Sequence, residues 1–137
     1  MSEARATCQP HRYTIGEGKG ASFILYPEQR LVVITLGNRV TVNELEEYAR
    51  LLQQDRAFQP TFSEIADMRS IQEVDLQADE MMRMADEIDP FSNEAKRAFV
   101  VKTSSQAHAA RMHKILLTHR NFEIFHSMEE AQRWIHA

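Results

Sequence analysis

The strongest constraint on the fold is the alternation of short β-branched runs with segments of helical periodicity. Residues 31–36, Leu-Val-Val-Ile-Thr-Leu, are apolar nearly throughout, which is typical of a strand buried on both faces. The other short β-prone runs lie at 23–26, 62–66, 98–101 and 122–125. Segments with helical spacing separate most of them, so the predicted order of elements is ββαβαβαβα.

The first two runs are joined by a turn in which Pro27 presets φ at the first central position. Strands joined by so short a turn form an antiparallel hairpin, whereas strands joined through helices are parallel with right-handed crossovers. The sequence therefore predicts an α/β fold with a mixed, mostly parallel five-stranded sheet and about four helices.

Several polar residues mark where the helices begin. Thr41 and Ser127 each open a capping box, with a glutamate three residues later. Asp75 is the predicted N-cap of the second helix, and the hydroxyl run at 103–105 caps the third. The expected inward faces are Val42, Leu45, Tyr48, Ala49 and Leu52, then Ala78, Met81, Met82, Ala85 and Ile88, then Ala109, Met112, Ile115 and Leu116, and finally Ala131, Trp134 and Ile135.

The N-terminal segment differs from the rest. Residues 1–20 are polar and hold three of the four glycines, so we expect a flexible arm before a single domain at 21–137. Alternatively, Tyr13 and Ile15 contribute an edge strand. The alternating glycines are only a weak phosphate-loop signal, because no clear strand precedes them and no helix follows.

Composition excludes several classes of protein. The chain has 137 residues, 43% of them hydrophobic, and a net charge of −4, which argues against a dedicated nucleic-acid binder. No apolar run approaches the roughly 18 residues of a membrane span, and the first twenty residues do not resemble a signal peptide. The single cysteine, Cys8, excludes internal disulfides and fits a cytoplasmic protein.

No catalytic or metal-binding constellation is recognisable. His108, His113 and His119 are spaced by five and six residues, whereas two ligands on one helical face need a spacing of about three or four. Adjacent acidic pairs point in different directions on a helix and are expected to be solvated. We therefore expect no enzyme activity, no cofactor and no metal.

The charges are segregated along the chain. Residues 72–89 contain seven acidic side chains and one basic one, whereas residues 96–120 contain six basic side chains and no acidic one. Either these are the solvated faces of two helices, or they are complementary surfaces that meet between subunits or meet a charged partner. The second alternative predicts a protein partner, including a second copy of the chain in a homodimer.

Three local patterns resemble the STAS domain superfamily, the fold of the sporulation anti-anti-sigma factors. They are the hairpin YPEQRLVVITLGNRVT leading into a capped helix, the strand FSEIADMR with its terminal Asp67, and the ending FEIFHSMEEAQRWI. The chain looks most similar to the SpoIIAA-like family of small bacterial proteins, over about Phe23 to Trp134.

This resemblance implies a position for a phosphorylation switch. In anti-anti-sigma members, a kinase modifies a serine in an Asp-Ser-Ser-Gly-like stretch before the second helix, and the added charge changes a partner contact. The matching stretch here is Asp75-Leu76-Gln77-Ala78, which keeps the aspartate but neither serine. The nearest hydroxyl is Ser70, which is either a turn residue or a displaced phosphorylation site.

Two functions therefore stay open. One is a non-catalytic regulatory or protein-interaction module, with its contact surface centred on residues 70–88. The other is a small-molecule or lipid-like ligand-binding protein that uses the crevice between the helices and the sheet. In a parallel sheet this crevice lies beyond the carboxyl ends of the strands, which Asp67, Arg69, Lys102 and Thr103 follow. The candidate residues for a partner or ligand surface are Asp67, Arg69, Ser70, Asp75, Gln77, Met81, Met84, Lys102 and Thr103.

The methionine-rich second helix separates the two functions. Met81 and Met82 fit the expected core face, whereas Met84 falls outside it. A solid core with an exposed Met84 favours the interaction module. A buried cavity with methionine in its wall favours the ligand-binding protein.

Overall fold

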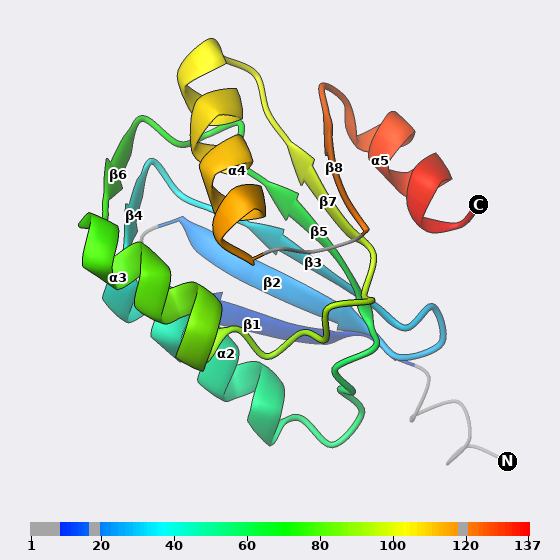
Figure 1. Cartoon of the computed structure of the whole chain (residues 1–137). Helices are drawn as coiled ribbons and strands as arrows, with labels where there is room; N and C mark the ends of the chain where they lie inside the picture. Colours follow the sequence, from blue (N-terminus) through cyan, green and yellow to red (C-terminus); the bar gives the residue numbers. More distant parts are fainter. Residues whose placement is uncertain (1–8, 17–19, 118–120) are drawn as a thin grey trace, which may run out of the picture.

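A six-stranded mixed sheet lies at the centre of the part of the chain that the structure describes (Figure 1). The structure is a computed structural model, and it describes residues 9–16, 20–117 and 121–137. The strands of both sheets are β1 (His11–Ile15), β2 (Ala21–Tyr26), β3 (Leu31–Thr35), β4 (Arg39–Thr41), β5 (Ser63–Asp67), β6 (Glu73–Asp75), β7 (Arg97–Val100) and β8 (Phe122–Phe125). The helices are α2 (Val42–Gln54), α3 (Ala78–Arg83), the π-helical turn η1 (Met84–Ile88), α4 (Ser104–Leu117) and α5 (Met128–Ile135). Cys8 and His119, discussed above, lie outside the described residues.

The strand order in the main sheet is β1-β2-β3-β5-β7-β8. The first three strands pair antiparallel, and β3, β5, β7 and β8 pair parallel. This confirms the predicted α/β fold with a mixed, mostly parallel sheet. The number of strands is one higher than predicted, because β1 adds an edge strand beside β2.

Residues 11–15 of the expected flexible arm form β1. Ile15 is buried while Arg12 and Thr14 are exposed, and the Tyr13 ring stacks on Phe23 of β2 with centroids 4.6 Å apart. The alternation of inward and outward side chains gives this segment an apolar face to bury against the domain. The arm interpretation therefore does not hold for these residues, and the alternative of an edge strand describes them.

A second, two-stranded parallel sheet joins β4 to β6. Asp75 ends β6 and forms an ion pair with Arg39, so the prediction that Asp75 caps the second helix is wrong. Gln77 takes that position, and its backbone N–H donates to Glu80 Oε1 at 2.8 Å. Strands of three residues are too short to show a hydrophobic period, which is why neither was predicted.

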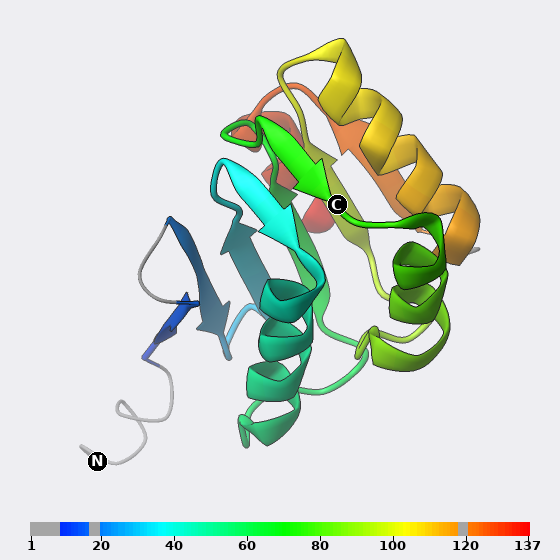
Figure 2. The same cartoon turned by 90° about the vertical axis from the view of Figure 1, so that its left-hand side faces the viewer.

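The helices form two unequal layers on the main sheet. Helices α2, α3, η1 and α4 lie on one face, and α5 alone covers the other (Figures 1 and 2). β3 contacts both layers, because Val32 and Ile34 join the core under α2 and α4 whereas Leu31 packs with α5 residues. This confirms the prediction of a strand buried on both sides.

Three of the four predicted helix starts have the expected capping contact, at Thr41, Thr103 and Ser127. The backbone N–H of Glu44 donates to Thr41 Oγ1 at 3.3 Å, and that of Glu130 donates to Ser127 Oγ at 3.2 Å. On α5, Ala131 and Ile135 are buried as predicted, and Trp134 is half-buried against Phe125.

The inward face of α3 and η1 differs from the prediction. Met84 is buried, whereas Met82 is 54% exposed. The apolar residues fit a helical stripe in either of two phases, and the structure adopts the one in which Met81 and Met84 point inward. The assignment of Met82 to the core face is therefore wrong, and Met84, expected outside that face, belongs to it.

The inward face of α4 was also mispredicted. Met112 and Ile115 are 39% and 67% exposed, and the buried positions are Gln106, Ala107 and Ala110. Small side chains let this helix lie close to the sheet. Counting large apolar residues therefore identified the wrong face.

Candidate ligand-binding cavity

A cavity of about 110 Å³ lies between the main sheet and the helices α2, α3, η1 and α4. Its wall is apolar over most of its extent. The strands contribute Ile34, Ala66 and Phe99, and the α3–η1 segment contributes Met81 and Met84. The cavity lies between helices and sheet and has methionines in its wall, but Asp67, Arg69, Lys102 and Thr103, the residues expected to follow the strand ends at a ligand crevice, do not line it.

One side of the cavity wall carries four polar side chains that bond to one another. Tyr48 Oη donates to Glu64 Oε2 at 2.6 Å, and Arg97 Nε donates to Glu64 Oε1 at 2.9 Å. Arg97 Nη1 also donates to Asp89 Oδ2 at 2.7 Å. We call Tyr48, Glu64, Asp89 and Arg97 the buried cluster.

The buried cluster is shielded from water. The side chains of Arg97, Glu64 and Asp89 are 4%, 2% and 9% exposed. Burial raises the pKa of Asp89 above its usual value, although Arg97 opposes the shift. Burial alone would lower the pKa of Arg97, but the charges of Glu64 and Asp89 outweigh it, so that pKa is raised and the guanidinium stays charged.

Sequence reasoning missed this cluster, although the strands carry a signal for it. Glu64 and Arg97 are register partners on the neighbouring strands β5 and β7. Each lies two residues before an inward apolar residue, Ala66 and Phe99, and side chains two apart share a face of a strand. The sequence therefore shows opposite charges at inward positions of two strands. It does not show that these two strands pair.

A second, shallower cleft lies beyond the carboxyl ends of β5, β7 and β8. It brings together four predicted site residues, and its lining is Asp67, Arg69, Ser70, Val101, Lys102 and His126. Arg69 Nε and Nη2 donate to the two carboxylate oxygens of Asp67, each at 2.9 Å. Burial alone would raise the pKa of Asp67, but the hydrogen bonds from Arg69 outweigh it, so the pKa is lowered.

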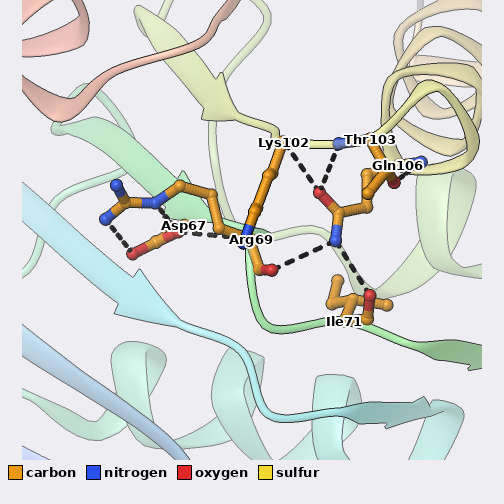
Figure 3. Close-up of polar contacts among 6 residues, drawn as sticks. All are labelled: Asp67, Arg69, Ile71, Lys102, Thr103 and Gln106. Atoms are coloured by element: carbon orange, nitrogen blue, oxygen red, sulfur yellow. Dashed lines mark hydrogen bonds and ion pairs between the residues drawn. The ribbon is translucent and has the colours of Figure 1, made fainter.

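Gln106 holds the loops of this cleft in place (Figure 3). Its Oε1 accepts from the backbone N–H groups of Lys102 and Thr103 at 2.7 and 3.1 Å. Its Nε2 donates to the carbonyls of Arg69 and Ile71 at 3.2 and 2.8 Å. Thr103 Oγ1 in turn accepts from the Gln106 N–H at 3.1 Å, as expected of a helix cap.

No family model and no curated protein matches the sequence. The structure is similar to the crystal structure of an uncharacterised DUF3478-family protein with a SpoIIAA-like fold from Shewanella loihica PV-4. The two share 16% sequence identity with a TM-score of 0.55, over 77% of this chain and 83% of that one. The chain has a SpoIIAA-like, STAS-type fold.

The SpoIIAA-like fold separates the predicted site residues into three places. Met81 and Met84 line the cavity. Asp67, Arg69, Ser70 and Lys102 line the cleft, with Thr103 next to it. Asp75 and Gln77 are exposed between β6 and α3, so the stretch 75–78 does precede a helix, as the resemblance implies.

Two further kinds of site are absent from the described residues. No group of three or more His, Cys, Asp or Glu side chains there is placed to hold a metal ion. No helix within the same residues has the length and apolar character needed to cross a bilayer. His113 lies in the cavity wall instead, with its ring stacked on Phe99 at a centroid distance of 5.5 Å.

Proposed function

We propose that this SpoIIAA-like chain is a non-catalytic binding protein that holds a small, largely apolar ligand in the cavity. The observation that carries the proposal is an apolar cavity whose wall contains a desolvated charge cluster. At about 24 cal/mol per Å³, an empty cavity of this size forgoes on the order of 2–3 kcal/mol of packing energy. That is a large fraction of the marginal stability of a domain, and a ligand would recover it.

The methionines support ligand binding over a purely external contact surface. Met84 is buried in the cavity wall, and Met81 lies beside it. Unbranched thioether side chains adapt to differently shaped ligands, so a methionine wall suits an adjustable site. The shallow cleft offers no such wall, because most of its lining is charged or polar.

Methionine methyl NMR tests the proposal with internal controls. Met68, Met81 and Met84 line the cavity, whereas Met82 and Met112 are exposed. Benzene is a suitable probe, since dry apolar cavities of about 150 Å³ bind it. We expect saturable shifts at the first three methyl groups and none at the other two. Equal shifts at all five, or no shift at any, would contradict the proposal.

A cavity-filling variant provides the matched comparison. Ala109 lines the cavity from α4, whereas Ala78 is exposed at the start of α3. Ala109→Leu is expected to abolish the benzene-induced shifts, and Ala78→Leu to leave them unchanged. Retention of the shifts in Ala109→Leu would place the bound probe elsewhere.

The regulatory or protein-interaction function is the second candidate, and exposed apolar side chains favour it. Val74, Met82, Met112 and Ile115 are 39% to 67% exposed, on β6, α3 and α4. Such side chains fit contact with a partner or with a second copy of the chain. Analytical ultracentrifugation of the wild type and of Met82→Lys/Ile115→Lys tests the self-contact, which predicts a dimer that only the wild type forms. A monomeric wild type would exclude the homodimer.

A further inference from the structure

We propose that the ligand carries a cationic hydrogen-bond donor, a primary or secondary ammonium group, which the carboxylates of the buried cluster bind. This inference rests on the proposed function, and it specifies the chemical class of the ligand. It is drawn from the charges and from the hydrogen-bonding capacity of the cavity wall.

The formal charges in the wall do not balance. Among the described residues that line the cavity, Arg97 carries one positive charge, and Glu64 and Asp89 carry two negative charges. His113, the other side chain there that can be charged near neutral pH, lies against the ring of Phe99. A cationic ligand would neutralise the excess negative charge, whereas an anionic ligand would add a third negative charge in the same dry space.

The donor groups of the cluster face carboxylates. Arg97 Nε and Nη1 donate to Glu64 and Asp89, Arg97 Nη2 forms an ion pair with Glu64 Oε1 at 2.8 Å, and the Tyr48 hydroxyl donates to Glu64. A carboxylate offers about four lone-pair positions. Asp89 accepts from Arg97 at 2.7 Å but meets the Phe91 N–H only at 3.5 Å, the long limit of a hydrogen bond. The Asp89 carboxylate therefore has unused capacity for accepting hydrogen bonds.

The rest of the cavity sets the size and polarity of the ligand. Its volume of about 110 Å³ corresponds to roughly four groups of water size at about 30 Å³ each. The walls contributed by Leu45, Met81, Met84 and Phe99 are apolar. A short alkyl or branched amine fits this description, with its ammonium group against Asp89 and its hydrocarbon part against the methionines.

Three probes of similar size test the inference on the wild-type protein. Butylamine, 1-butanol and butanoate are titrated at about pH 8, where an ordinary imidazole is neutral. Methionine methyl shifts provide the readout. We expect butylamine to bind at least about tenfold more tightly than either of the others. Equal or tighter binding of butanoate or 1-butanol would overturn the inference.

Two charge-removing variants test whether Asp89 binds the ammonium group. Asp89→Asn keeps the shape of the side chain, and Asp86→Asn makes the same charge change at an exposed position of η1. We expect Asp89→Asn to abolish the preference for butylamine and Asp86→Asn to retain it. Retention of the preference in a folded Asp89→Asn would contradict the assigned contact.

Benzene distinguishes a failure of the ammonium inference from a failure of the proposed ligand-binding function. If benzene shifts the cavity methyl groups and no butyl probe does, the ammonium inference fails and the proposed function stands. If neither benzene nor any butyl probe shifts them, both fail.

Discussion

Two carboxylate–guanidinium pairs involve the same strand, β5, and have nearly the same nitrogen–oxygen distances in opposite surroundings. Glu64 meets Arg97 at 2.8 Å, with their side chains 2% and 4% exposed. Asp67 meets Arg69 at 2.9 Å, with their side chains 15% and 42% exposed. Because solvent screens the second pair and not the first, equal distances correspond to unequal energies. The buried pair can therefore create a selective polar patch in an apolar cavity, and the exposed pair cannot.

The largest predicted effect comes from breaking the buried pair. Arg97→Met keeps most of the side-chain volume but leaves Glu64 and Asp89 without their shared cation. Losing one partner of a buried ion pair costs about 3–5 kcal/mol. Urea unfolding is expected to show a loss of this size. A loss below about 1 kcal/mol would mean that the buried pair behaves like an exposed one.

A smaller effect is expected where a neutral side chain supports the exposed pair. Gln106→Met removes the amide that bonds the loops around Arg69 and Lys102 and leaves buried backbone groups unpaired. The expected loss is about 1–3 kcal/mol by urea unfolding. Gln53→Met at an exposed position of α2 is the matched control, with an expected change within about 0.5 kcal/mol. Equal losses in the two variants would exclude the supporting role of Gln106.

The stability contributions of Asp89 and Asp67 are expected to change with pH in opposite directions. The pKa of Asp89 is raised in the folded state, so its contribution to stability falls as pH rises from 3.8 through the folded pKa. The pKa of Asp67 is lowered, so its contribution is present above 3.8 and is lost as pH falls through the folded pKa.

Urea unfolding as a function of pH tests this contrast. Asp89 is expected to make the wild type less stable as the pH rises above 3.8, and Asp89→Asn to remove that trend. Asp67 is expected to make the wild type less stable as the pH falls below 3.8, and Asp67→Asn to remove that trend. If both substitutions changed the pH dependence of stability in the same direction, the environments assigned to Asp89 and Asp67 would be contradicted.

The smallest effect is expected for the exposed pair itself. Arg69→Ala is predicted to cost less than about 1 kcal/mol, because exposed ion pairs contribute little and are screened by salt. Added sodium chloride is expected to reduce even this difference. A cost comparable with that of Arg97→Met would show that the two pairs differ less than their exposure implies.

Most of the fold could be predicted from the sequence, because local patterns specify it. The run at 31–36 has a composition typical of a strand buried on both faces, and the caps at Thr41 and Ser127 depend on residues three apart. Short elements without a period, such as β4 and β6, carry no such local signal. The phases of α3 and α4 were mispredicted for a related reason, since tertiary packing chose between two helical faces.

The candidate site could be predicted only in part. A crevice between helices and sheet follows from the α/β architecture, and the methionines of the second predicted helix were candidates for its wall. The buried cluster, however, brings together residues from α2, β5, β7 and the segment after η1. Glu64 and Arg97 meet because β5 and β7 are neighbours, and this pairing of strands is a tertiary fact that no local pattern encodes.

A crystal structure of the protein under xenon pressure tests directly whether the apolar cavity is a ligand site. Xenon occupies dry apolar cavities and has little affinity for charged clefts. We expect xenon density in the cavity, in contact with Met84 and Phe99, and none in the cleft lined by Asp67 and Arg69. A cavity without xenon, or with side chains collapsed into it, would contradict the claim that this space is a ligand site.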